Sequence, residues 1–139
     1  MPEAANLSYN DIIVGNVYEF TRTISREDIL AFTKLTGDYN PLHVDEGFGK
    51  TSNFKQNIVH GMLIGSLFST LVGMYCPGKN SLYLGQTLNF KQPVYIGDTL
   101  VVRGTVLIKN DSIGLVTFKT EAWRGNEVVI TGEAKVKAL

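Results

Sequence analysis

The longest apolar stretch of the chain runs from Gly61 to Gly78 and contains no charged residue. A helix that is apolar on every side has no face for solvent, so this pattern predicts a helix in the middle of the fold with other structure wrapped round it. At a rise of about 1.5 Å per residue it is too short for a membrane span, which needs roughly 20 apolar residues.

Four segments of the second half are rich in β-branched and aromatic residues and are separated by Gly, Pro, Asn and Asp turn signals. They predict strands over residues 82–90, 99–108, 114–123 and 128–138. The last segment alternates with period two, which places Val128 and Ile130 on one face and Val129 on the other. Strands that are joined by short turns must lie antiparallel to one another.

The first half predicts one more strand, over residues 17–24, followed by a helix. Ser25 is expected to cap this helix in a capping box with Asp28. Gly37 is expected to end it. Helical spacing predicts one buried stripe, made of Ile29, Phe32 and Leu35. The whole pattern predicts an α+β fold, in which an antiparallel sheet of about five strands wraps round a central apolar helix.

Length and charge narrow the class of protein. The 139 residues fit a single domain spanning 1–139, and 13 basic against 13 acidic residues leave no net charge to attract nucleic acid or an anionic membrane. The N-terminus lacks the basic start and apolar core of a signal peptide, which favours the cytoplasm. The single cysteine, Cys76, reads as an apolar filler rather than a nucleophile, because no histidine lies nearby in the sequence.

Candidate chemistry concentrates just after the first helix, where Asp38 and His43 lie five positions apart. A carboxylate and an imidazole on one stiff turn are suited to holding a water molecule between them. Taken alone, the pair is also compatible with a capping aspartate and a histidine that serves only the structure. Asp38 lies beyond a helix C-terminus, where the partial negative charge disfavours an anion unless a group such as His43 compensates.

Three neighbours of this pair are predicted to shape the turn. Gly37 permits a left-handed backbone. Asn40 precedes Pro41 and is pushed toward an extended conformation, and Pro41 has no N–H to donate. We therefore expect a rigid turn that presents its side chains outward, rather than a continued helix or strand.

Three segments together identify a family resemblance. They are Thr36-Gly37-Asp38-Tyr39-Asn40-Pro41-Leu42-His43-Val44-Asp45, Val59-His60-Gly61-Met62-Leu63 and Tyr83-Leu84-Gly85-Gln86-Thr87-Leu88-Asn89-Phe90. This combination closely resembles the MaoC-like (R)-specific enoyl-CoA hydratases. The resemblance implies a hot-dog fold, hydration of trans-2-enoyl-CoA with no cofactor beyond the CoA of the substrate, and a homodimer whose sheets join edge to edge so that both subunits line each site.

The resemblance also implies roles for individual residues. Asp38 and His43 would be the catalytic pair, the Gly61 backbone N–H would bind the thioester oxygen, and Ser69 on the central helix would support the site. His60 is expected to fix the loop before that helix. Which of Asp38 and His43 delivers the proton to Cα stays open, as do the acyl chain length, the carrier (CoA or acyl carrier protein) and the pathway, whether polyhydroxyalkanoate precursor supply, fatty-acid breakdown or a fermentation.

Two other functions compete with hydration. A hot-dog acyl-CoA thioesterase is disfavoured because several such families carry the working carboxylate on the central helix, and residues 61–78 contain neither Asp nor Glu. A non-catalytic acyl-CoA-binding module is disfavoured by the presence of both Asp38 and His43. A metal site is not expected, since His43 and His60 lie on separate segments without ligand spacing.

Overall fold

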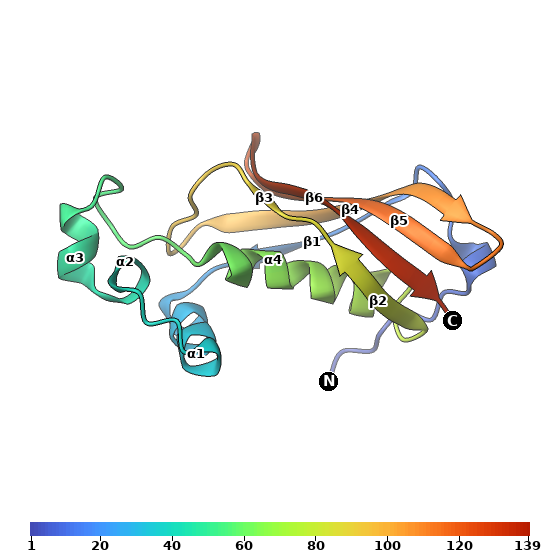
Figure 1. The fold of residues 1–139 in the computed structure, drawn as a ribbon, viewed down its shortest axis with the longest axis horizontal. Coiled ribbons are helices and arrows are strands. Elements are labelled where there is room, and N and C mark those ends of the chain that lie inside the picture. The colour runs from blue at the N-terminus through green and yellow to red at the C-terminus, as the bar shows by residue number, and fades with distance from the viewer.

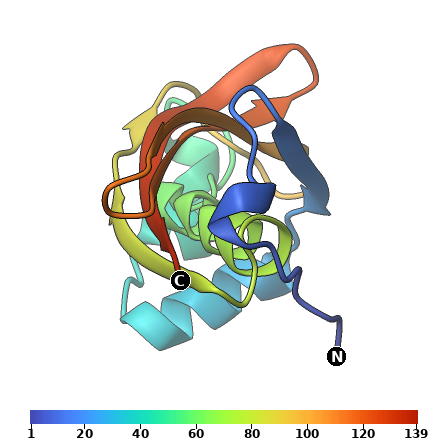
Figure 2. The same ribbon diagram turned by 90° about the vertical axis from the view of Figure 1, so that its right-hand side faces the viewer.

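The computed structural model describes residues 1–139 and contains one antiparallel sheet that curls round a central helix (Figures 1 and 2). The helices are α1 (Arg26–Thr36), α2 (Pro41–Val44), α3 (Glu46–Thr51) and α4 (Gly61–Thr70). The strands are β1 (Val17–Thr23), β2 (Ser81–Gln86), β3 (Asn89–Phe90), β4 (Thr99–Asn110), β5 (Leu115–Arg124) and β6 (Glu127–Ala138). The short helices α1 to α3 gather at the end of the molecule where α4 begins (Figure 1).

The sheet has the order β1-β4-β5-β6-β2, and β3 also pairs with β6, so it contains six strands rather than five. The segment predicted as one strand over 82–90 is divided into β2 and β3 at Thr87 and Leu88. At this break the Thr87 hydroxyl accepts a hydrogen bond from the Glu133 N–H. The backbone at Thr87 passes close to β6 at Gly132, and we call this contact the crossing. Only a glycine fits there, because a Cβ on residue 132 would lie 1.9 Å from the Thr87 carbonyl oxygen.

The alternation predicted for β6 is wrong at one position. Val129 is fully buried, whereas Val128 is half-buried. A β-bulge causes the difference: Ala122 of β5 pairs with Ile130 and the next residue of β5 pairs with Val128, so Val129 is an extra residue. A bulge shifts the side-chain alternation by one residue, which no period-two pattern anticipates.

The core lies between α4 and the concave face of the sheet. Leu63, Ile64 and Phe68 of α4 pack against buried residues of the sheet such as Leu100 and Val102. The helix continues for five more residues, Leu71–Tyr75, as a wider π-helical turn. No helix of the structure is both long and apolar enough to cross a membrane.

The expectation that the central helix has no open face is wrong for the single chain. Met62 is 59% exposed, and Ser66 and Ser69 are also exposed along the same side of α4. These positions recur at helical spacing, so they form one face that neither the sheet nor α1 covers. The fold therefore leaves an open strip along its central helix.

The helix α1 begins and ends as predicted, but its buried stripe differs. Ser25 and Asp28 form the capping box, and Gly37 ends the helix in a left-handed conformation. Ile29 is buried, yet Leu35 is 84% exposed. At 3.6 residues per turn, spacings of three carry each successive residue further round the helix, so Leu35 has left the buried side. Thr33, one turn after Ile29, is buried in its place.

Candidate active site

The turn after α1 is built from two side chains that bond to the backbone ahead of them. Asp38 Oδ1 accepts the Asn40 N–H at 3.1 Å, and Asn40 Oδ1 accepts the Leu42 N–H at 2.9 Å. Pro41 then opens α2, where its missing N–H costs nothing. The expected turn is therefore followed by one helical turn, and His43 lies on that turn rather than in a loop.

Three polar side chains, two of them candidate catalytic residues, meet at this point. Asp38, His43 and His60 each have a ligand-type atom, and these atoms all lie within 4.8 Å of one another. The imidazole rings of His43 and His60 are stacked, with centroids 3.9 Å apart and an interplanar angle of 28°. The structure thus brings Asp38 and His43 together and adds His60, whose place in the cluster the sequence did not indicate.

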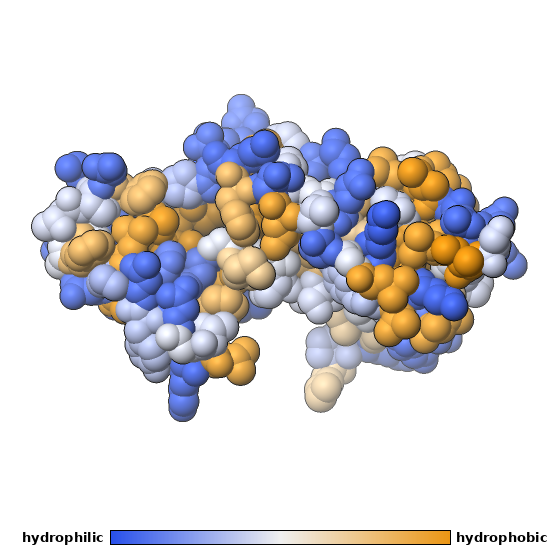
Figure 3. All heavy atoms as spheres, in the orientation of Figure 1, coloured by the Kyte–Doolittle hydropathy of each residue, from blue (hydrophilic) through white to orange (hydrophobic).

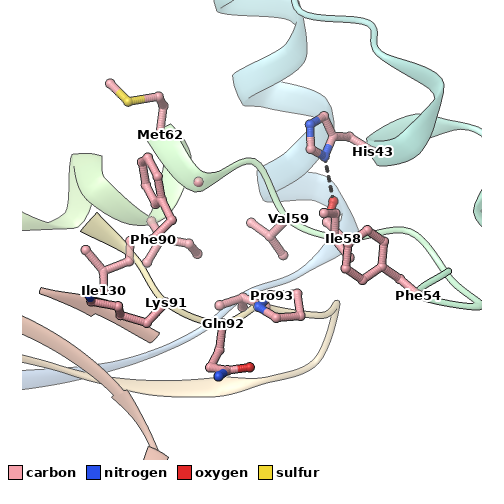
Figure 4. A pocket seen from close by; sticks show the side chains of 13 residues that line it. His43, Phe54, Ile58, Val59, Met62, Phe90, Lys91, Gln92, Pro93 and Ile130 are labelled. Atoms are coloured by element: carbon pink, nitrogen blue, oxygen red, sulfur yellow. Dashed lines mark hydrogen bonds between the residues drawn. The ribbon is translucent and has the colours of Figure 1, made fainter. Parts of the chain in front are cut away.

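His43 is held in place through its Nδ1 nitrogen. Its Nδ1 lies 2.8 Å from the carbonyl oxygen of Ile58, which can only accept, so Nδ1 carries the hydrogen (Figure 4). In the neutral ring Nε2 is then an acceptor. The Asp38 side chain is half exposed. A carboxylate and an imidazole nitrogen therefore offer two acceptors within reach of solvent.

His60 is buried, with 2% of its surface exposed. Its Nε2 lies 3.2 Å from the Asp38 carbonyl oxygen and 3.3 Å from Thr33 Oγ1, and 3.8 Å from the Asp38 carboxylate. Burial lowers the pKa of His60, while the hydrogen bond to the Asp38 carbonyl acts in the opposite direction. The Asp38 carboxylate thus accepts the Asn40 N–H and lies 3.8 Å from His60 Nε2, whereas His43, the neighbour expected to compensate it, presents an acceptor nitrogen.

The start of α4 supplies a backbone donor. Gly61 is the first residue of the helix, so its N–H has no acceptor within α4, and no loop carbonyl accepts it. A Cβ at this position would lie 2.8 Å from the Phe90 ring. A cavity of about 420 Å³ adjoins this point, with His43 and Phe54 at one end and Met62 and Phe90 at the other (Figure 4).

A second cavity, of about 680 Å³, lies along the open face of α4. Asp38 and Ser69 both line it, and Met62 lines both cavities. Ser66, one turn before Ser69, donates its hydroxyl back to the Leu63 carbonyl. The predicted site residues therefore divide between two adjoining cavities, with Gly61 and His43 in the first and Asp38 and Ser69 in the second.

The Asp38, His43 and His60 cluster raises the question of a metal, since the two histidines are not apart as the sequence spacing implied. The donor set does not fit one. His60 Nε2 faces the Asp38 carbonyl, which requires a hydrogen on that nitrogen, and a protonated nitrogen cannot ligate a metal. Only Asp38 and His43 Nε2 remain, and zinc sites use at least three protein ligands.

Cys76 plays no part in the site. Its side chain is buried to 1% exposure, and burial raises the pKa of its thiol to about 11. A thiol with that pKa stays protonated near neutral pH, so it is a poor nucleophile.

Known proteins are similar in sequence to this chain over nearly its whole length. The family model described as MaoC like domain matches residues 11–129. An (R)-specific enoyl-CoA hydratase of Aeromonas caviae is 39% identical over 132 residues, which cover 94% of this chain and 98% of the relative. A mitochondrial 3-hydroxyacyl-[acyl-carrier-protein] dehydratase of Arabidopsis thaliana is 38% identical and covers 87% of this chain and 74% of its own length.

Solved structures agree with this assignment. The unliganded R-hydratase PhaJ1 from Pseudomonas aeruginosa matches with a TM-score of 0.93 at 38% identity, over 97% of this chain and 87% of that chain. The (R)-hydratase from A. caviae involved in PHA biosynthesis matches with a TM-score of 0.89 at 40% identity, over 92% and 98%. These matches confirm the predicted hot-dog fold. The chain therefore belongs to the MaoC-like domain family.

Proposed function

We propose that this protein is a hydro-lyase that adds water to trans-2-enoyl-CoA to give (R)-3-hydroxyacyl-CoA, and catalyses the reverse dehydration. The observation that carries the proposal is the meeting of the Asp38 carboxylate with the His43 imidazole next to the free N–H that opens α4. The names of the relatives supply the substrate class and the stereochemistry.

The two acceptors of the pair can orient one water. If that water donates one hydrogen to Asp38 and the other to His43 Nε2, its lone pair is free to attack Cβ of the enoyl thioester. One proton passes to the pair, the hydroxyl bonds to Cβ, and the electrons of the double bond move through Cα onto the thioester oxygen. The pair then returns a proton to Cα, which closes the balance. Such proton handling contributes typically about 10² to 10⁴ in rate.

The developing enolate needs a donor, which the Gly61 N–H provides. The first N–H groups of a helix carry partial positive charge, and the cavity that adjoins Gly61 is lined mostly by apolar side chains, so this donor acts in a medium of reduced dielectric constant. Ser69 lines the Asp38 cavity and is proposed to support the same site.

The decisive experiment measures hydration of crotonyl-CoA by the loss of enoyl thioester absorbance. Asp38→Asn and His43→Ala should each lower kcat/KM by at least about a hundredfold with an unchanged circular dichroism spectrum. Glu46→Gln is the matched control: it removes an exposed carboxylate on α3 and should leave activity near that of the wild type.

Three outcomes of the same assay would contradict the proposal. Near-normal activity of Asp38→Asn or His43→Ala would remove that residue from the mechanism. Release of free thiol, detected with a thiol reagent, would identify a thioesterase. No absorbance change with any chain length of enoyl-CoA would favour a binding module, and chiral analysis of the product decides the stereochemistry.

We further propose that the protein is a homodimer joined through β2. This strand ends the sheet and pairs only with β6, so its other edge carries unpaired backbone groups. Leu82 and Leu84 of β2 are 48% and 56% exposed, and hydrophobic spheres gather over β2 and β3 in Figure 3. A partner on this edge would also cover the open face of α4, where Asp38 and Ser69 line their cavity, so both subunits would line each site.

A further inference from the structure

His60 contacts every segment that builds the proposed site. It opens α4, one residue before Gly61. Its ring stacks on His43 of α2 and lies against Phe32 of α1, with the Phe32 and His60 centroids 4.9 Å apart. Its Nε2 meets Thr33 of α1 and the backbone of Asp38. One side chain therefore links the acid, the imidazole and the helix start.

We propose that His60 is a positioning residue for the proposed hydration. Its Nε2–H donates to the Asp38 carbonyl and fixes the backbone of Asp38. Its ring stacks against the His43 ring and holds it in place. The inference rests on the proposed function and deepens it. His60 does not touch the reacting atoms. It sets the distance between the carboxylate of Asp38 and the imidazole of His43.

The polar contacts of His60 fix its tautomer. The Asp38 carbonyl only accepts hydrogen bonds, so Nε2 must carry the hydrogen, and Thr33 Oγ1 shares it. Nδ1 is then the unprotonated nitrogen, and it is buried without a partner. An unpartnered acceptor in the interior is unfavourable. The unpartnered Nδ1 is explained if the protein needs the hydrogen bond from Nε2 to the Asp38 carbonyl.

His60 also has to stay neutral to do this work. The titratable groups that face it are the Asp38 carboxylate and the stacked His43 imidazole. A second positive charge directly against His43 would repel protonated His43, and the positive end of α4 acts in the same sense. A neutral imidazole supports His43 without competing for the proton that the reaction moves.

The test uses two variants that lose the ring equally but differ in reach. The amide nitrogen of His60→Gln can occupy the place of Nε2 and donate to the Asp38 carbonyl, whereas that of His60→Asn is too short. His60→Asn should lower kcat for crotonyl-CoA about ten- to a hundredfold with KM changed less than about threefold, since small misplacements of reacting groups have effects of this size. His60→Gln should recover most of the lost kcat.

A merely structural role predicts a different result, because both variants remove the same buried ring and should then lose activity alike. Equal kcat values for the two variants, a loss confined to KM, or wild-type kcat in His60→Asn would each overturn the proposal. An inactive wild type would instead contradict the hydratase assignment, so the two failures are distinguishable.

A measurement on the unmodified protein keeps the proposal testable if the variants do not fold. Long-range ¹H–¹⁵N correlation of the ¹⁵N-histidine-labelled protein should show His60 as the Nε2–H tautomer from about pH 6 to 8. Detection of the Nδ1–H tautomer, or of a protonated ring in that range, would contradict the bond to the Asp38 carbonyl and with it the positioning role.

Discussion

At the scale of single residues, the buried His60 couples stability to pH. The unfolded chain takes up a proton on this side chain near its ordinary pKa of about 6.5, whereas burial lowers the pKa of His60 in the fold. Between those two pKa values the unfolded state binds more protons, so the free energy of unfolding falls as the pH falls.

We therefore expect the urea midpoint of the wild type to decrease from pH 7 to pH 5, and to decrease less in His60→Gln. The carboxyl groups of Asp11 and Asp28 also have lowered pKa values in the fold, through hydrogen bonds from Ser8 and Ser25. Their contribution is lost only near and below the ordinary carboxyl pKa of about 3.9, outside this window. Parallel pH profiles for the two proteins would show that His60 is not the group responsible.

Gly61 gives a second prediction at this scale. A methyl group there would lie 2.8 Å from the Phe90 ring, beside the proposed oxyanion donor. Phe90 is 54% exposed and can turn away, so Gly61→Ala should change the unfolding midpoint little while lowering kcat/KM for crotonyl-CoA by about tenfold or more. Full activity in this variant would show that the thioester does not approach the Gly61 N–H.

The meeting of Asp38 with His43 and the turn between them could be predicted from sequence because both lie within one short segment. His60 could not be placed with them, since its bond to Asp38 joins residues 22 positions apart and depends on how α4 meets α1. His43 and His60 lie on separate segments of the sequence, so their spacing did not indicate that the two rings meet. A histidine directly before a buried helix was the available signal, but its partners are set by tertiary packing.

At the scale of elements, the sequence rules for helix ends predicted correctly the features that depend only on neighbouring residues. The capping box of Ser25 and Asp28 and the left-handed Gly37 bound α1 as predicted. The exposure of Leu35 and the burial of Val129 escaped prediction because each depends on cumulative geometry, helical drift in one case and a bulge in the partner ladder in the other. The break between β2 and β3 escaped prediction for another reason, since the contacts of Thr87 there come from Gly132 and Glu133 of β6, which are distant in the sequence.

That break gives a prediction about Gly132. A Cβ on Gly132 would lie 1.9 Å from the Thr87 carbonyl oxygen, which is backbone and cannot turn aside. Gly132→Ala should therefore lower the free energy of unfolding by about 1–3 kcal/mol or more, the cost of overpacking. Gly85→Ala is the matched control, because Gly85 lies on β2, which pairs with the same strand, and nothing lies within 4 Å of its added Cβ. Equal urea midpoints for the two variants would show that the crossing tolerates a side chain.

At the scale of the whole molecule, the two edges of the sheet differ in character. The β1 edge exposes Val17 but otherwise mainly polar side chains, including Glu19 and Thr21. The β2 edge exposes Leu82 and Leu84, and it borders the open face of α4. An apolar edge next to an incomplete cavity is what a symmetric partner would cover, whereas a monomer would be expected to protect it with charge.

Leu84→Lys tests this at the proposed interface, since a lysine on a strand edge opposes pairing with another edge. We expect sedimentation at micromolar concentration to show a dimer for the wild type and a monomer for Leu84→Lys, together with a loss of hydration because each site loses the surface that the partner contributes. Ile108→Lys is the matched control: Ile108 on β4 is 60% exposed, comparable to Leu84, but lies away from β2 and should leave the dimer and its activity intact. A wild-type monomer that is fully active would contradict the shared site, and a Leu84→Lys dimer would place the interface elsewhere on the molecule.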